Sequence, residues 1–109
     1  MKAMEINRGQ FEQMVNGEEP VLIDFWAPWC GYCRRLGPAY EKIAEQYNGS
    51  GRLIVGKVNI DEEGGLAEKE KIEVIPTLVL YRNGKALDSI VAPESKAMIE
   101  EFIEKALEK

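Results

Sequence analysis

The stretch VLIDFWAPWCGYC, from Val21 to Cys33, decides the fold because it joins a predicted strand to a predicted helix through two cysteines. Its first part, Val21–Trp26, is apolar except for one acid, which is typical of a strand buried on both faces. From Gly31 to about Tyr47, apolar residues recur at helical spacing. Cys30 is therefore expected where a buried strand passes into the N-terminus of a helix.

Local signals outside this stretch predict further helices and one hairpin. Asn7 followed three residues later by Gln10 predicts a capping box at the start of a short helix. The acids Asp61–Glu63 suit the first turn of a second short helix that extends through Leu66–Lys71, since they complement the helix dipole. The dipeptide Asn83–Gly84 predicts the two-residue turn of a hairpin.

The order of these elements is βαβαβαββα, which predicts an α/β fold. Parallel strands joined by crossovers, followed by an antiparallel hairpin, give a mixed sheet with helices on both faces. A final helix opens at Glu94 or Ser95. Strands are predicted at Ala3–Ile6, Val21–Trp26, Leu53–Ile60, Pro76–Arg82 and Lys85–Val91.

Composition predicts a single soluble domain spanning residues 1–109, with 45% apolar and 30% charged residues. The net charge of −5 argues against binding to nucleic acid or to an anionic membrane. The N-terminus lacks the apolar stretch of a signal peptide, and no window approaches the roughly 20 apolar residues of a membrane span, so a cytoplasmic protein is expected. In that reducing compartment a CxxC pair favours redox chemistry or metal binding over a structural bridge.

The position of the two cysteines suggests disulfide exchange. At a helix N-terminus, Cys30 experiences roughly +0.5 of an elementary charge and several unpaired N–H groups, which stabilise a thiolate and lower the pKa of the thiol. Cys33 lies one turn further along and is expected to be less exposed, yet within reach of the first sulfur. This is the arrangement of an attacking thiol and a resolving thiol.

Three other interpretations compete with exchange. A structural disulfide that closes so small a loop contributes only about 2 kcal/mol by the chain-entropy relation. A zinc site needs four ligands, and this chain has two cysteines and no histidine, so only a dimer that pools thiolates supplies them. Two inert core thiols are the third option, although the flanking Trp29 and Gly31 favour a surface turn. The absence of histidine also removes Cys–His hydrolysis.

Three motifs carry a family resemblance: FWAPWCGYC before a helix, then VGKVNID, then IPTLVLYRNGK. In kind, order and spacing they resemble the thioredoxin family over essentially the whole chain. The resemblance implies a thioredoxin-like three-layer α/β/α sandwich with a mixed five-stranded sheet. It also implies a protein-disulfide reductase in which Cys30 is the nucleophile, Cys33 resolves the mixed disulfide, and the two form a redox-active disulfide.

The resemblance implies no bound cofactor and no metal. The chain contains no GxGxxG motif for a dinucleotide, so electrons are expected from an external reductase, by analogy an NADPH-dependent thioredoxin reductase or a similar donor. The expected partners are this donor and disulfide-containing client proteins, and the protein is expected to be a monomer.

Asp24 matches the buried acid of the family. Burying an unpaired carboxylate raises its pKa, and a carboxyl that titrates near neutrality beneath Cys33 can take and return a proton. A solvent-facing aspartate with ordinary hydrogen bonds is the alternative from the residues alone. Lys57 matches the family lysine near that acid and is expected to moderate its charge; its alternative is a plain surface lysine.

Five further positions are expected at the substrate-binding surface through the resemblance. Pro76 matches a cis-proline that brings Ile75 against the CxxC, where its backbone can pair with an extended client segment. Trp29 gives a flat apolar docking face beside Gly31, whereas Trp26 is expected to fill the core. Ala92 stands where thioredoxins usually carry glycine, and Ala92 and Pro93 together are expected to narrow or stiffen the rim of the site.

Tyr32 stands where the commonest family motif has proline. A tyrosine keeps an N–H near the sulfurs, which favours the thiolate form of the dithiol and predicts a less negative reduction potential than that of a CGPC protein. Tyr32 is also placed with the substrate-binding residues. Rival functions are a more oxidising, isomerase-like or glutathione-coupled exchange protein, and a thioredoxin-like module that binds a partner without turnover.

Overall fold

The computed structural model describes residues 2–109 and has the predicted order βαβαβαββα. Both elements that flank the cysteines have the limits that the pattern predicts, because strong local signals mark each end. The strands are β1 (Met4–Glu5), β2 (Val21–Trp26), β3 (Ile54–Asn59), β4 (Thr77–Arg82) and β5 (Lys85–Val91). The helices are α1 (Arg8–Val15), α2 (Gly31–Tyr47), α3 (Gly64–Lys69) and α4 (Lys96–Leu107).

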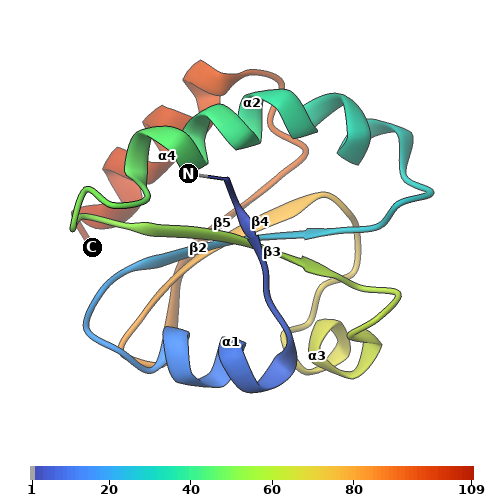
Figure 1. The fold of residues 1–109 in the computed structure, drawn as a ribbon, viewed down its shortest axis with the longest axis horizontal. Helices are drawn as coiled ribbons and strands as arrows, with labels where there is room; N and C mark the ends of the chain where they lie inside the picture. The colour runs from blue at the N-terminus through green and yellow to red at the C-terminus, as the bar shows by residue number, and fades with distance from the viewer. Residues whose placement is uncertain (1) are drawn as a thin grey trace.

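The five strands form one mixed sheet in the order β1-β3-β2-β4-β5. The central strand β2 runs parallel to β3 and antiparallel to β4, and β5 completes the antiparallel hairpin. Helices α2 and α4 cover one face of this sheet, and α1 and α3 cover the other (Figure 1). The predicted three-layer sandwich with a mixed five-stranded sheet is confirmed.

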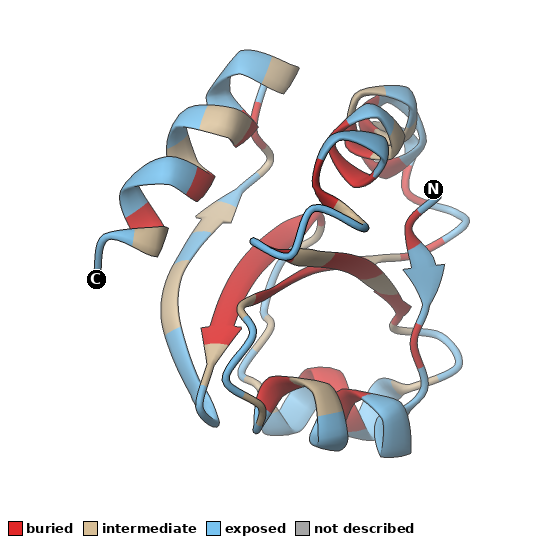
Figure 2. Ribbon diagram, turned by 60° about the vertical axis from the view of Figure 1, so that its left-hand side comes forward, coloured by how far each residue is buried: buried red, intermediate tan, exposed pale blue. Residues whose placement is uncertain are grey.

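Two hydrophobic cores lie on opposite faces of the sheet. Alternate residues of β2 point to the two sides, so Leu22 packs with α2 and α4 while Ile23 packs with α1 and α3. Figure 2 shows the buried residues concentrated on the inner strands and on the sheet-facing sides of the helices. The apolar run Val21–Trp26 is explained by this position, since a strand covered on both faces needs apolar residues in both registers.

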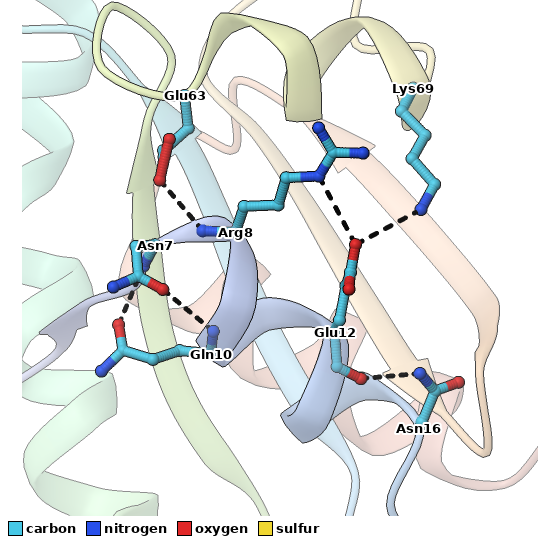
Figure 3. A network of polar contacts seen from close by, with 7 residues as sticks. All are labelled: Asn7, Arg8, Gln10, Glu12, Asn16, Glu63 and Lys69. Carbon is cyan, nitrogen blue, oxygen red and sulfur yellow. Dashed lines mark hydrogen bonds and ion pairs between the residues drawn. The ribbon is translucent and has the colours of Figure 1, made fainter.

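Helix α1 begins with the predicted capping box. The N–H of Gln10 donates to the Asn7 side chain, and the Asn7 N–H donates to the Gln10 side chain, both at 2.9 Å. Figure 3 shows that α1 is also tied to the segment around α3. The first N–H of the helix donates to Glu63, and Glu12 lies 3.8 Å from the Lys69 ammonium. These contacts hold the N-terminal half of α1 against α3 and the turn before it.

The prediction that Asp61–Glu63 form the first turn of α3 is wrong, because the helix begins at Gly64. The side chain of Asn59 accepts the Asp61 N–H at 2.9 Å, and the Asn59 carbonyl accepts the Glu63 N–H at 3.0 Å. This Asx-type turn satisfies the same N–H groups that a helix would use. The acids therefore lie in a turn that precedes the helix.

The hairpin turn at Asn83–Gly84 is confirmed. Both residues have positive φ, 53° and 78°, as a two-residue type I′ turn requires. Their N–H groups donate to the carbonyls of Gly17 and Val15, so the tip of the hairpin also closes the end of α1.

Candidate active site

The two cysteines lie at the junction of β2 and α2 and form a disulfide with a Cα–Cα distance of 5.2 Å. Cys30 is the N-cap of α2, and the Cys33 N–H donates to its sulfur at 3.2 Å. That N–H is one of the donors that a helix start leaves without an intrahelical partner. The exposed fraction of the residue is 9% for Cys30 and 4% for Cys33, so the second cysteine is the less exposed, as predicted. The helix start therefore favours negative charge on the outer sulfur.

The carboxyl of Asp24 is buried next to this junction, with 5% of the residue exposed. Its Oδ1 has no hydrogen-bond partner among residues 2–109. Burial raises the pKa of Asp24 from 3.8 to about 7, and the positive charge of Lys57 partly opposes this rise. The carboxyl is thus able to exchange a proton near neutral pH.

Lys57 lies opposite Asp24 on the neighbouring strand β3. Its ammonium lies 3.5 Å from Glu41 and 4.0 Å from Glu5, and 5.1 Å above the ring of Trp26. The lysine therefore acts on the buried acid through space, while its ion pairs are with these two glutamates. Both glutamates raise the pKa of Asp24 by repulsion.

A cavity joins these groups to the second cysteine. The residues that line it include Asp24, Cys33, Tyr40, Glu41 and Lys57. Because the side chains of Lys57 and Glu41 are 27% and 30% exposed, the cavity reaches the surface. The buried carboxyl and the resolving sulfur thus share one space that solvent can enter.

The far side of the disulfide carries an apolar surface. The Ile75–Pro76 peptide bond is cis, as the family resemblance implies. Half-buried Ile75 packs against the buried cluster formed by Ala27, Cys30 and Cys33. Trp29 is 66% exposed, and its indole N–H donates to Asp61 at 3.0 Å. Gly31, exposed at the start of α2, leaves the approach to the sulfur free of a side chain. An extended segment can lie across this surface.

Tyr32 makes contacts that the sequence does not predict. Its hydroxyl donates to the carbonyls of Ala92, at 3.2 Å, and Pro93, at 3.1 Å. The guanidinium of Arg35 lies 5.3 Å from the centre of its ring. Ala92 itself has a φ of 45°, and its N–H donates to the carbonyl of Pro76 at 2.9 Å. The middle of the CxxC is thus bonded to the loop after β5.

All ten residues singled out in the sequence gather at one end of the sheet. Asp24, Cys33 and Lys57 line the cavity, and the others lie at the apolar surface or at its rim. Pro93, expected beside Ala92 at the rim, lies with them, and so do Glu5 and Glu41, which nothing in the sequence marked as part of a site. The ten are Asp24, Trp29, Cys30, Gly31, Tyr32, Cys33, Lys57, Ile75, Pro76 and Ala92.

Within residues 2–109, no three potential ligands among aspartate, glutamate, cysteine and histidine come together in a group that could hold a metal ion. In the same part of the chain, no helix combines the length and apolar character needed to cross a membrane.

A sheet that brings two cysteines to a helix start, next to a buried acid, has the arrangement that thiol–disulfide exchange requires. The family model for thioredoxin matches residues 2–105. The chain belongs to the thioredoxin family.

Named relatives agree with this assignment. Thioredoxin 1 of Nostoc sp. is 40% identical over 106 residues, which cover 96% of this chain and 97% of that protein. The chloroplastic M-type thioredoxin of Pisum sativum is 40% identical over 101 residues, which cover 92% of this chain. The chain spans 58% of the length of this pea protein and of its spinach counterpart. The crystal structure of Malassezia sympodialis thioredoxin superposes with a TM-score of 0.87 at 33% identity, covering 98% of this chain and 95% of that one.

Proposed function

We propose that the protein reduces disulfide bonds in other proteins by dithiol–disulfide exchange. The thiolate of Cys30 attacks one sulfur of the client disulfide, forms a mixed disulfide and releases the first client thiolate. Cys33 then loses its proton and attacks the sulfur of Cys30, which closes the bridge and releases the second client thiolate. The observation that carries the proposal is the sulfur of Cys30 held at the helix start, with the Cys33 N–H donating to it.

In this scheme Asp24 is the base for the second step. Its pKa of about 7 suits a group that accepts the proton of Cys33 and later returns it, through solvent in the cavity that both residues line. Lys57 limits the rise of that pKa, so the carboxyl still ionises in the neutral range.

The client is proposed to lie across the apolar surface in an extended form. Trp29 and Ile75 supply apolar contact, and the free backbone of Ile75 pairs with the client as an added strand would. Pro76 and Ala92 shape the side of this surface, and Gly31 and Tyr32 border the reactive sulfur.

The same proposal extends to the setting of the reaction. Residues 1–109 are proposed to act as one domain and as a monomer in the cytoplasm. After each turnover the protein takes two electrons from an NADPH-dependent thioredoxin reductase or a similar donor. Its partners are that donor and client proteins that contain disulfides.

The test is the reduction of insulin disulfides with dithiothreitol as the terminal reductant. The protein should accelerate precipitation of the insulin chains, and Cys30→Ser should abolish the acceleration. Cys33→Ser should instead retain a mixed disulfide between Cys30 and the client, visible on a non-reducing gel. A module that only binds its partner predicts no acceleration and no effect of Cys30→Ser, and either result would sink the proposal.

The electron source is tested by comparing two recycling systems. NADPH with thioredoxin reductase should sustain turnover, and glutathione with glutathione reductase should sustain much less. The reverse order would show a glutathione-coupled protein and would overturn the proposed donor.

A further inference from the structure

Ala92 is held in a backbone conformation that is unfavourable for alanine. Its φ of 45° lies in the left-handed region, where the Cβ of an L-residue crowds the following carbonyl. Glycine adopts this region freely, whereas a residue with a side chain remains there only if its surroundings hold it. The loop after β5 must therefore contain contacts that oppose relaxation of Ala92.

Three hydrogen bonds hold Ala92 and its neighbour from two sides. The N–H of Ala92 donates to the carbonyl of Pro76 at 2.9 Å. On the other side, the single hydroxyl proton of Tyr32 is shared between the carbonyls of Ala92, at 3.2 Å, and Pro93, at 3.1 Å. The hydroxyl of Tyr32 and the carbonyl of Pro76 thus bond the carbonyl and the N–H of the strained residue Ala92.

The ring that carries this hydroxyl is itself positioned. Tyr32 is half-buried, and the guanidinium of Arg35, one turn along α2, lies 5.3 Å from its ring centre, within cation–π range. On the loop side, buried Pro93 and the ring of Tyr32 line the same hollow. A ring held in this way can support the loop without a large loss of side-chain entropy.

We propose that the Tyr32 hydroxyl acts as a clasp that holds Ala92 in its left-handed conformation and so sets the rim of the surface on which a protein client lies. The clasp joins Tyr32, which lies between the two cysteines, to Ala92, which is bonded to Pro76. It therefore connects two sides of that surface. Tyr32 is thus a specificity-determining residue for protein clients. The effect on clients rests on the proposed function, whereas the hydrogen-bonded clasp is independent of that function.

Because the two residues act together, they should be energetically coupled. Tyr32→Phe removes only the hydroxyl, and Ala92→Gly removes the steric cost that the hydroxyl opposes. In the parent chain, Tyr32→Phe should raise KM for insulin about fivefold, the equivalent of one neutral hydrogen bond. In the presence of Ala92→Gly, the same change should raise KM less than about twofold, a coupling that a double-mutant cycle measures.

Two comparisons separate this effect from general loss of structure. The ratio of kcat/KM for insulin to that for a small aromatic disulfide should fall with Tyr32→Phe, because only the protein client spans the rim. Tyr47→Phe is the matched control, since its hydroxyl donates to Glu104 at 2.7 Å elsewhere on α2. It should leave KM unchanged in both backgrounds.

Amide hydrogen exchange of the oxidised protein tests the clasp without any client. Tyr32→Phe should accelerate exchange of the Ala92 N–H at least about fivefold. Unchanged exchange, or an equal rise in KM with and without Ala92→Gly, overturns the inference. If exchange accelerates but the parent chain does not reduce insulin, the clasp stands and the proposed function fails.

Discussion

Replacing Asp24 with asparagine should stabilise the folded protein at neutral pH and leave its stability in acid almost unchanged. The carboxyl is 5% exposed, and its Oδ1 has no partner among the described residues. Burial raises its pKa from 3.8 to about 7, against the opposing charge of Lys57. Asparagine has nearly the same shape and no charge, so the exchange isolates the effect of ionisation.

The sign follows from proton linkage. Well below a pH of 3.8 the carboxyl is protonated in both the folded and the unfolded chain, and it has no pH-dependent effect on stability. As the pH rises, the unfolded chain loses this proton first, so the folded state becomes relatively less stable until the pH reaches about 7. The interval between the two pKa values corresponds to at most about 4 kcal/mol.

The assay is guanidinium unfolding of the oxidised protein and the Asp24→Asn variant from about pH 4 to pH 9. Any cost of burying the amide is constant with pH. The change with pH in the difference between the two free energies of unfolding therefore reports the ionisation of the Asp24 carboxyl. That difference should grow in favour of the variant up to about pH 7 and then level off. Parallel curves would refute the reasoning.

Asp88→Asn is the matched control for this experiment. A hydrogen bond from Lys109 lowers the pKa of the exposed Asp88 carboxyl, so its ionised form favours the folded state. Removing this charge should cause a small loss of stability at neutral pH, of opposite sign to the effect at Asp24. A gain of similar size in both variants would point to net charge rather than burial.

Three other changes have defined outcomes. Glu41→Gln removes a negative charge near Asp24, so the pKa of Asp24 should fall when its carboxyl carbon is titrated by NMR. Gly56→Ala places a Cβ against the buried Ile6 side chain, and the free energy of unfolding should fall by about 1–3 kcal/mol. Tyr32→Pro should make the reduction potential more negative, as measured in dithiothreitol redox buffers.

Each of these changes has its own control or contrary result. Glu45→Gln, one turn from Glu41 on the exposed side of α2, should leave the titration of Asp24 unmoved. Gly37→Ala, whose added Cβ meets no atom within 4 Å outside its own helix backbone and chain neighbours, should lower the free energy of unfolding far less than Gly56→Ala does. A potential that is equal or less negative after Tyr32→Pro would contradict the prediction for that residue.

The elements predicted most accurately are those whose limits are marked by neighbouring residues. The capping box at Asn7, the glycine of the hairpin turn and the apolar run of β2 each depend on a few adjacent positions. The start of α3 was predicted wrongly because two local signals compete there. Acids favour a helix N-terminus, but Asn59 captures the same N–H groups in a turn.

The reactive pair could be located from its spacing, whereas several contacts of the residues around it could not. Glu41 meets Lys57 across 16 positions of the chain, and the hydroxyl of Tyr32 meets Ala92 across 60. Neither contact has a periodicity or a spacing that marks it in the sequence. Only the packing of α2 against the sheet and against the loop after β5 creates these contacts.

The strand that leads to the cysteines is the middle strand of the sheet, because β2 is bonded to β3 on one side and to β4 on the other. We expect the amide hydrogens of such a strand to exchange with solvent mainly through global unfolding of the domain. The reactive end of the molecule therefore has little room to reshape itself around what it meets. If the protein reduces client disulfides as proposed, the client must adapt: a disulfide inside a rigid protein becomes accessible only after local opening, whereas one in a mobile loop is accessible at once.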